Sequence, residues 1–450
     1  MEVEVVSKEF IKPSRPTPNH LKIHKLSLLD QFFPSLYIPL VLYYTVNEAE
    51  EATRKAKHIL PLLKQSLSET LALFYPLAGK INDGLSIECD DEGALFVEAR
   101  ADFPLPLLLH QPDLETIAKL LPCPAAWAEA KAGDRVVMVQ ATAFACGGVA
   151  VSVLISHAAA DCASFSTFLK GWAAMARKSG GAPHPNFDAS SRFIPSKGLA
   201  EEDSMSAIYL PFLKTSRCGT RRFVFDSSAM ARLKAKATNS QVQNPTRVEV
   251  VTALMRKSIV AALNKVSNLE KPVGMILPLN IRRRAVPSFP DDSTGNYVWV
   301  MTVLCSPEEK DNGLPDLISR YREIKDKVDG PFVKGFVGDG GSVMLSNAVR
   351  EIGESFAGVQ DQVTITSWCN FDHYEIDFGW GRPAWVSTVG FTEEMQNRPT
   401  DFVTLLDTKS RKGVEAWVFM GEHELHVLEQ NEELLEFASI NPSTLLTTHG

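Results

Sequence analysis

His157 and Asp161 have the types and the spacing of a general base and a group that positions it. Residues 148–155 before them are apolar and rich in β-branched side chains, which predicts a buried strand that ends at Ser156 and His157. Asp161 and Ser164 are both plausible helix starts. Apolar residues then recur at helical spacing: Phe165, Phe168, Leu169 and Trp172. The expected local structure is therefore a strand, a tight turn that carries the histidine, and a helix.

A histidine in such a turn can do acid–base chemistry. Its unperturbed pKa is about 6.5, so a neutral imidazole can take a proton from a hydroxyl or an amine near neutral pH. Three alanines, residues 158–160, follow it, and we expect them to leave room for a substrate beside the ring. The same spacing also suits a hydrogen-bonded core histidine, so other features of the chain are needed to distinguish a catalytic role from a structural one.

A second motif, Asp-Phe-Gly-Trp-Gly, occupies residues 377–381. Glycine adopts backbone conformations that other residues resist, so a structural turn is the expected role of the whole motif. Its members are Asp377, Phe378, Gly379, Trp380 and Gly381.

Length and composition indicate an ordinary globular protein. The chain has 450 residues, of which 45% are hydrophobic and 22% charged, and we expect two large domains. A net charge of -8 argues against nucleic-acid binding. The longest apolar stretch, Phe33 to Tyr44, contains Pro34 and Pro39 and is far shorter than the roughly 20 residues that span a bilayer. We therefore expect neither a nucleic acid nor a membrane as partner.

The first residues and the cysteines favour a cytoplasmic protein. Glu2 and Glu4 stand where a signal peptide has basic residues, and no apolar segment follows them. The seven cysteines are scattered and include no Cys-x-x-Cys pair, which indicates reduced thiols. His157, His373, His423 and His426 lack metal-ligand spacing beside carboxylates, so we expect no metal site.

Alternating helices and strands indicate an α/β protein with a ligand site between two domains. We predict an N-terminal domain over residues 1–180, a crossover rich in Gly, Pro and Ser over 181–220, and a C-terminal domain over 221–450. Helices are expected over 48–74, 227–237, 248–264 and 314–328. Pro61 should break or kink the first of them, so two helices are possible there. Strands are expected near 85–89, 95–99, 222–225, 274–279 and 297–305, with a strand-rich end from 363 to 427.

The pairing of the two motifs resembles the BAHD acyltransferases of plants. The resemblance covers nearly the whole chain and extends to Pro16-Thr17-Pro18, Leu26 to Gln31, Leu71 to Gly79, Asn280 to Arg284, Gly295-Asn296 and Asn441 to Ser443. The opening is most similar to the vinorine synthase-like branch, whose members often acetylate alkaloids or terpenoids. The resemblance implies a monomer with a fold like chloramphenicol acetyltransferase: two similarly sized mixed-sheet domains with a solvent channel between them.

The resemblance also implies a reaction, the transfer of an acyl group from a coenzyme A thioester to a hydroxyl or an amine. His157 matches the base that deprotonates the acceptor for direct attack on the thioester. Asp161 matches an acid that points away from the substrate and pairs with an arginine, which we expect at Arg282, with Arg284 as second choice. Such a pair would position the turn rather than take part in the chemistry.

Thr366, Ser367 and Trp368 resemble the family segment that faces the thioester. Trp368 is the expected hydrogen-bond donor to the oxyanion, and Thr366 and Ser367 are candidate contacts to coenzyme A. Ordinary packing is the alternative for Trp368. Lys234 is a candidate for the phosphates of coenzyme A, although a solvated helix face explains it equally well. Acyl-CoA would be a cosubstrate, so no permanently bound cofactor is expected.

The donor and the acceptor are less defined. Acetyl-CoA is the favoured donor, while benzoyl, tigloyl and hydroxycinnamoyl donors stay open, as does O- against N-acylation. The motif of malonyl-transferring members is missing. Two alternatives remain: a covalent route through the thiolate of Cys162, and a non-catalytic protein that binds a small molecule or a partner on the same fold.

Overall fold

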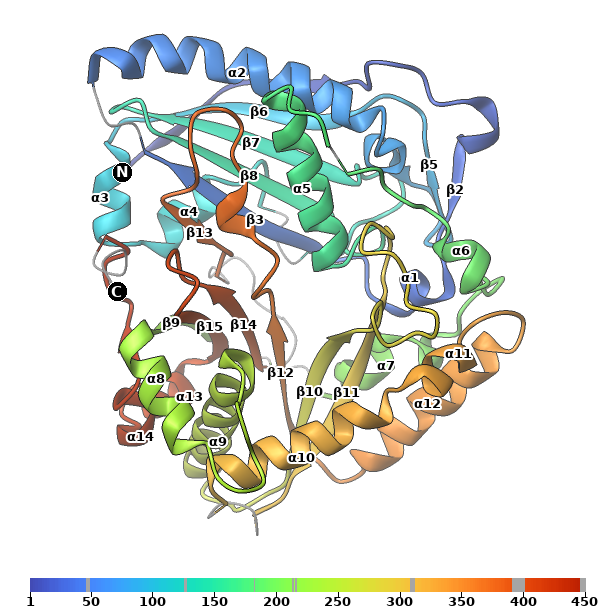
Figure 1. Cartoon of the computed structure of the whole chain (residues 1–450), viewed down its shortest axis with the longest axis vertical. Coiled ribbons are helices and arrows are strands. Elements are labelled where there is room, and N and C mark those ends of the chain that lie inside the picture. Colours follow the sequence, from blue (N-terminus) through green and yellow to red (C-terminus); the bar gives the residue numbers. More distant parts are fainter. Residues whose placement is uncertain are drawn as a thin grey trace.

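A computed structural model of the chain describes residues 1–45, 49–124, 128–181, 183–212, 214, 217–307, 312–390 and 401–445. Figure 1 shows two large mixed sheets, one in the upper and one in the lower half of the molecule, with helices packed around them. The α/β fold with two mixed-sheet domains that the sequence predicts is confirmed.

The first sheet has six strands in the order β1-β6-β7-β8-β3-β13. They are β1 (Val3–Ile11), β6 (Ala94–Ala101), β7 (Val137–Phe144), β8 (Val149–Ser156), β3 (Tyr37–Tyr44) and β13 (Trp385–Ser387). Only β6 and β7 run parallel. Every residue of β3 and β8 is buried, as their nearly continuous apolar sequences require. The predicted strand before His157 is therefore a central strand of this sheet.

The second sheet has seven strands in the order β11-β10-β12-β14-β15-β9-β16. They are β11 (Val298–Cys305), β10 (Val273–Asn280), β12 (Asp361–Ser367), β14 (Asp401–Asp407), β15 (Val414–Gly421), β9 (Cys218–Phe225) and β16 (Ser439–Ile440). β12 runs parallel to both its neighbours, and the other pairs are antiparallel. A small third sheet consists of β2 (Ile23–Lys25), β5 (Ser86–Glu88) and β4 (Lys80–Ile81).

Helices cover the outer faces of both large sheets. α2 (Ala49–Leu71) and α5 (Cys162–Ala176) pack together on the first sheet, and α9 (Arg247–Ser267), α10 (Leu314–Lys327) and α13 (Glu422–Leu428) lie against the second (Figure 1). The other helices are α1 (Leu28–Phe32), α3 (Leu105–His110), α4 (Leu114–Lys119), α6 (Ala189–Arg192), α7 (Met205–Tyr209), α8 (Ser227–Lys236), α11 (Gly330–Gly335), α12 (Gly341–Ser355) and α14 (Glu432–Leu435). The predicted helices near 227–237, 248–264 and 314–328 are thus confirmed as α8, α9 and α10.

The expected break at Pro61 is wrong. α2 continues through Pro61 to Leu71 as one helix. Ile59 on one side of the proline and Leu63 and Leu67 on the other are all buried in the first hydrophobic core, and this packing offsets the hydrogen bond that the proline cannot donate. The predicted start of this helix at residue 48 lies outside the described residues.

The two halves of the chain exchange elements. β13, from residues 385–387, is the edge strand of the first sheet and pairs with β3. In the other direction, Leu28 and Phe32 of α1 belong to the hydrophobic core of the second sheet. The domain boundaries at 180 and 220 stay a prediction, and these two exchanges show that each large sheet depends on both halves.

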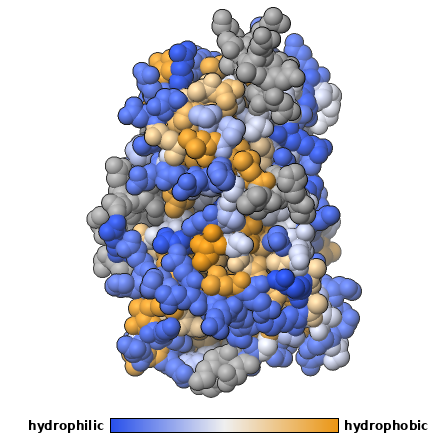
Figure 2. Space-filling model, turned by 90° about the vertical axis from the view of Figure 1, so that its left-hand side faces the viewer, coloured by the Kyte–Doolittle hydropathy of each residue, from blue (hydrophilic) through white to orange (hydrophobic). Residues whose placement is uncertain are grey.

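The face on the left-hand side of Figure 1 is largely hydrophilic, with apolar side chains in separate small groups (Figure 2). Within the described residues, no helix is long and apolar enough to cross a membrane.

Candidate active site

His157 lies in the turn where β8 ends and α5 begins. Its main-chain N–H donates to the carbonyl of Leu36 at 2.8 Å, and its own carbonyl accepts from the side chain of Asn296 at 2.7 Å. Its Nδ1 atom is buried and makes no hydrogen bond within the described residues, so Nε2 is the ring nitrogen that the adjacent cavity can reach. The alanines at 158–160 are buried and do not line that cavity, so the expectation that they make room for a substrate is wrong.

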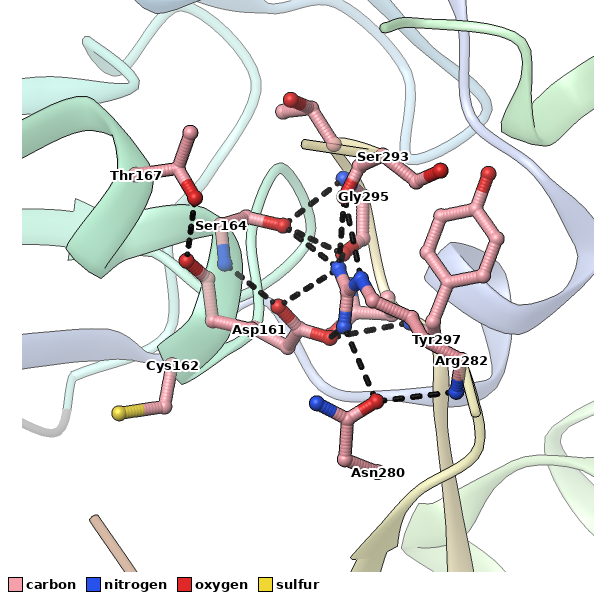
Figure 3. A network of polar contacts seen from close by, with 12 residues as sticks. Asp161, Cys162, Ser164, Thr167, Asn280, Arg282, Ser293, Gly295 and Tyr297 are labelled. Carbon is pink, nitrogen blue, oxygen red and sulfur yellow. Dashed lines mark hydrogen bonds and ion pairs between the residues drawn. The ribbon is translucent and has the colours of Figure 1, made fainter. Parts of the chain in front are cut away.

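Asp161 is the N-cap of α5, and its carboxylate accepts from the N–H of Ser164 at 2.8 Å. It also receives Arg282, with Oδ2 2.6 Å from Nη1 and Oδ1 3.1 Å from Nη2. Arg282 donates in addition to the carbonyls of Ser293 and Gly295 (Figure 3). The pairing of Asp161 with Arg282 that the family resemblance implies is present, whereas Arg284 donates to the carbonyls of residues 325 and 328.

Burial and charge set the protonation of these two groups in different ways. Burial would raise the pKa of Asp161, but the charge and hydrogen bonds of Arg282 outweigh it and hold that pKa below its usual range. Burial lowers the pKa of His157, and the opposing effects of its own carbonyl, Asp161 and Asn296 are smaller. The site therefore holds an ionised carboxylate and a neutral imidazole at neutral pH.

A cavity of about 190 Å³ opens beside His157. Most of its wall is apolar, and the polar groups are few. The lining residues come from both halves of the chain: Phe33, Pro34, Leu36, Ile38, His157, Asp161, Cys162, Ala163, Met205, Tyr209, Pro278, Asn280, Val298, Thr364, Thr366, Ser367, Trp368, Phe371 and Phe402. A concave, mostly apolar site with a few polar groups is typical of small-molecule binding.

The cavity forms where two strands of the second sheet separate. β10 and β12 are paired only over residues 273–276 and 361–364. Beyond that point β10 continues beside β11, while β12 continues beside β14. Pro278 lies in the separated part of β10 and has no N–H to offer a neighbouring strand. Its neighbour two residues on, Asn280, lines the cavity, as does Trp368 across the gap.

The segment expected to face a thioester does line this cavity. Thr366 and Ser367 end β12 and are half-buried, and Trp368 is buried beside them. The main-chain N–H of Trp368 donates to the carbonyl of Leu405 at 2.8 Å, which fixes the main chain at Trp368 relative to β14. The structure thus brings Thr366, Ser367 and Trp368 together with His157.

The Asp-Phe-Gly-Trp-Gly segment is a turn outside the cavity lining. The Asp377 carboxylate accepts from the N–H groups of Gly379 and Gly381 at 2.7 and 2.9 Å, and both glycines have positive φ, +111° and +112°. Phe378 is buried against Trp172 of α5, with ring centroids 4.9 Å apart, and stacks on Trp380. These contacts fit the structural role expected for the motif.

The comparison with known proteins decides the family. The model of the Transferase family matches residues 1–435, nearly the whole chain. The chain belongs to the plant BAHD acyltransferases.

Two BAHD relatives cover 99% of this chain and their own full length. An epi-neemfruitin B 7-O-acetyltransferase of Melia azedarach is 39% identical, and a limonoid 7-O-acetyltransferase of Citrus sinensis is 41% identical. The solved structure of vinorine synthase is 31% identical and superposes with a TM-score of 0.80 over 98% of this chain and all of that one. The expected acyl-CoA-dependent acyltransferase is thereby confirmed.

Lys234 and Cys162, two further candidates from the sequence, differ from the BAHD site residues above in position or in reactivity. Lys234 on α8 is partly exposed and does not line the cavity. Cys162 does line it, but burial and the neighbouring Asp161 raise the pKa of its thiol well above the usual range. Figure 3 shows its sulfur turned away from the Asp161–Arg282 network. A protonated thiol is a poor nucleophile, which weighs against the covalent route.

Sequence reasoning missed three residues around the imidazole. Phe33 stacks on His157, with ring centroids 5.1 Å apart and an interplanar angle of 6°. Asp30 accepts from the main-chain and side-chain nitrogens of Asn296 at 2.6 and 2.9 Å, and Asn296 in turn donates to His157. The capping box of α1, which pairs Ser27 with Asp30, was readable as a local signal; its link to Asn296 was not, because the two are 266 residues apart. Among the described residues no cluster of three His, Cys, Asp or Glu side chains could hold a metal ion.

Proposed function

We propose that this chain transfers an acetyl group from acetyl-CoA to a hydroxyl of an oxygenated terpenoid of the limonoid class. The observation that carries the proposal is the imidazole of His157, which presents one reachable nitrogen to a mostly apolar cavity. The two relatives near 40% identity, which by name acetylate limonoid oxygens, favour this acceptor class. A cavity of about 190 Å³ suits the reacting ends of donor and acceptor, whose remaining parts would extend beyond it.

The proposed mechanism is direct attack in a ternary complex. Nε2 of neutral His157 accepts the proton of the acceptor hydroxyl as the oxygen attacks the thioester carbonyl carbon. A C–O bond forms, and the carbonyl oxygen takes up negative charge near Trp368, whose indole N–H donates to it. The tetrahedral intermediate then collapses, the C–S bond breaks, and the imidazolium returns the proton to the sulfur of coenzyme A.

Other residues hold this arrangement in place. The Asp161–Arg282 pair fixes the turn that carries His157, and the turn over residues 377–381 fixes α5 through Phe378 and Trp172. Thr366 and Ser367 would contact the acyl-CoA, and Lys234 would meet its phosphates outside the cavity. We further propose a monomer of the cytoplasm, which is consistent with seven cysteines that form no disulfide.

The test is product formation by the purified protein. Acetyl-CoA, malonyl-CoA and benzoyl-CoA would each be combined with limonoids that carry a free 7-hydroxyl, with the same limonoids already acetylated there, and with alkaloid alcohols. We expect mass spectrometry to find a monoacetylated limonoid and an equal amount of free coenzyme A. Turnover only with alkaloids would refute the acceptor class, and saturable coenzyme A binding without any turnover would refute catalysis.

A further inference from the structure

The imidazole of His157 is held on its face by an aromatic ring. Phe33 lies parallel to it, at an interplanar angle of 6° and a centroid distance of 5.1 Å, which is within the range of stacked pairs. Phe33 follows the last residue of α1, is only 8% exposed and lines the cavity together with His157. Phe33 therefore covers part of one face of the imidazole and limits the access of water to it.

The main chains on both sides of this stack are tied together. The N–H of His157 donates to the carbonyl of Leu36, three residues after Phe33. On the other side, Asp30 of α1 holds Asn296, and Asn296 donates to the carbonyl of His157. Phe33 is therefore anchored relative to His157 by hydrogen bonds before and after it in the sequence.

Among the described residues, no carboxylate makes a hydrogen bond to the ring itself. Both oxygens of Asp161 are engaged by Arg282, and the carboxylate of Asp30 is engaged by Asn296 and the Ser27 N–H. Within the described residues Nδ1 of His157 has no partner in hydrogen-bond geometry, and the polar groups that act on the ring are its own carbonyl, Asp161 and Asn296. Among the described residues, the other ionisable side chains that line the cavity with His157 are Cys162 and Tyr209, and burial raises the pKa of both.

We propose that Phe33 is the positioning residue of the general base: its ring fixes the plane of the imidazole and shields one face from water, so that Nε2 stays directed into the cavity. The proposal rests on the proposed role of His157 as base. A displacement of about 1 Å at a reacting group can cost about 10²-fold in rate, so the plane of this ring matters for turnover.

The adjacent residue provides a matched control. Phe32 is fully buried, stacks on Trp299 at 5.4 Å and does not line the cavity. Phe33→Leu, Phe33→Tyr and Phe32→Leu would be compared by their urea unfolding midpoints and by the pH dependence of kcat and KM. The pKa of His157 would also be followed by NMR of histidine labelled with ¹³C at Cε1, with His157→Gln to assign the signal.

We expect Phe33→Leu to lower kcat by about 10-fold to 10²-fold, and to move both the acidic limb of the profile and the NMR titration of His157 upward toward about 6.5. Phe33→Tyr should restore both, and Phe32→Leu should lower stability without moving either. A Phe33→Leu variant with the wild-type kcat and titration, and only a higher KM, would overturn the proposal. The NMR titration needs no acceptor, so a failure to find the acceptor would leave this result intact.

Discussion

Asp161 gives both carboxylate oxygens to Arg282, at 2.6 and 3.1 Å, and both side chains are at most 3% exposed. The acid of the histidine motif is thus paired with a guanidinium from the other half of the chain, whose position also depends on the carbonyls of Ser293 and Gly295. This geometry separates Asp161, which is engaged by Arg282, from His157, the proposed base, and the predictions below follow from that separation.

Asp161→Asn should destabilise the fold as well as lower the rate. It leaves the charge of Arg282 buried without its counterion, and breaking such a pair costs about 3–5 kcal/mol. We expect a lower free energy of unfolding in urea titrations, whereas Arg283→Gln, which removes an exposed pair with Asp291, should leave it unchanged. Full stability with abolished turnover would instead place Asp161 in the chemistry.

His157→Ala should remove activity but not stability. Loss of a general base costs about 10²- to 10⁴-fold in rate, and within the described residues this imidazole takes part in no ion pair, so little electrostatic stabilisation is lost with it. Release of the thiol of coenzyme A would be measured against His423→Ala, whose side chain is exposed on α13. Equal activities of the two variants would contradict the role of His157.

Trp368→Phe tests the oxyanion contact, because phenylalanine keeps most of the packing and lacks the N–H donor. If the indole donates to the oxyanion, kcat should fall by about 10²- to 10³-fold with little change in KM. A kcat within about 2-fold of the wild type would leave Trp368 as a packing residue of the cavity wall.

Cys162→Ala should keep activity close to that of the wild type. The thiol is protonated at neutral pH because burial raises its pKa, so it cannot form an acyl-enzyme at a useful rate. Rapid-quench kinetics with labelled acetyl-CoA should show no burst of protein-bound acetyl group. A burst that disappears in the variant would revive the covalent route.

Stability should fall as the pH drops below about 6.5. Burial lowers the pKa of His24 and of His373 to about 4, so between these values the unfolded chain binds protons that the folded chain does not, and unfolding becomes more favourable. His373 is also held by Ser166 at 2.8 Å. In His373→Gln the urea midpoint should decrease less steeply between pH 7 and pH 5; an unchanged slope would contradict this assignment.

Local patterns were enough to predict the elements around the base. The apolar run before His157 became β8, Asp161 became the N-cap of α5, and the glycine motif became a turn that needs positive φ at Gly379 and Gly381. These features depend on residues close in sequence, where periodicity, capping and backbone preference act directly.

Features that depend on packing between distant segments could not be predicted. Phe33 lies more than a hundred residues before His157, and nothing in its neighbours indicates a stacked partner. β10 and β12 separate beyond Ile276 and Thr364, where β10 stays paired with β11 and β12 with β14. This pairing depends on the packing of the whole sheet and not on the local sequence. The continuous helix at Pro61 could not be predicted for the same reason, because α2 is stabilised by the core against which it packs.

The position of β13 limits how the halves of two acyltransferases can be joined in a hybrid protein. Three residues of the C-terminal half complete the edge of the first sheet, next to β3, a strand buried along its whole length. A hybrid that joins the N-terminal half of one acyltransferase to the C-terminal half of another therefore grafts a foreign strand onto that edge. In chimeras designed to alter the acceptor, residues 385–387 should therefore come from the same parent as the N-terminal half, because they form hydrogen bonds with β3 of that half.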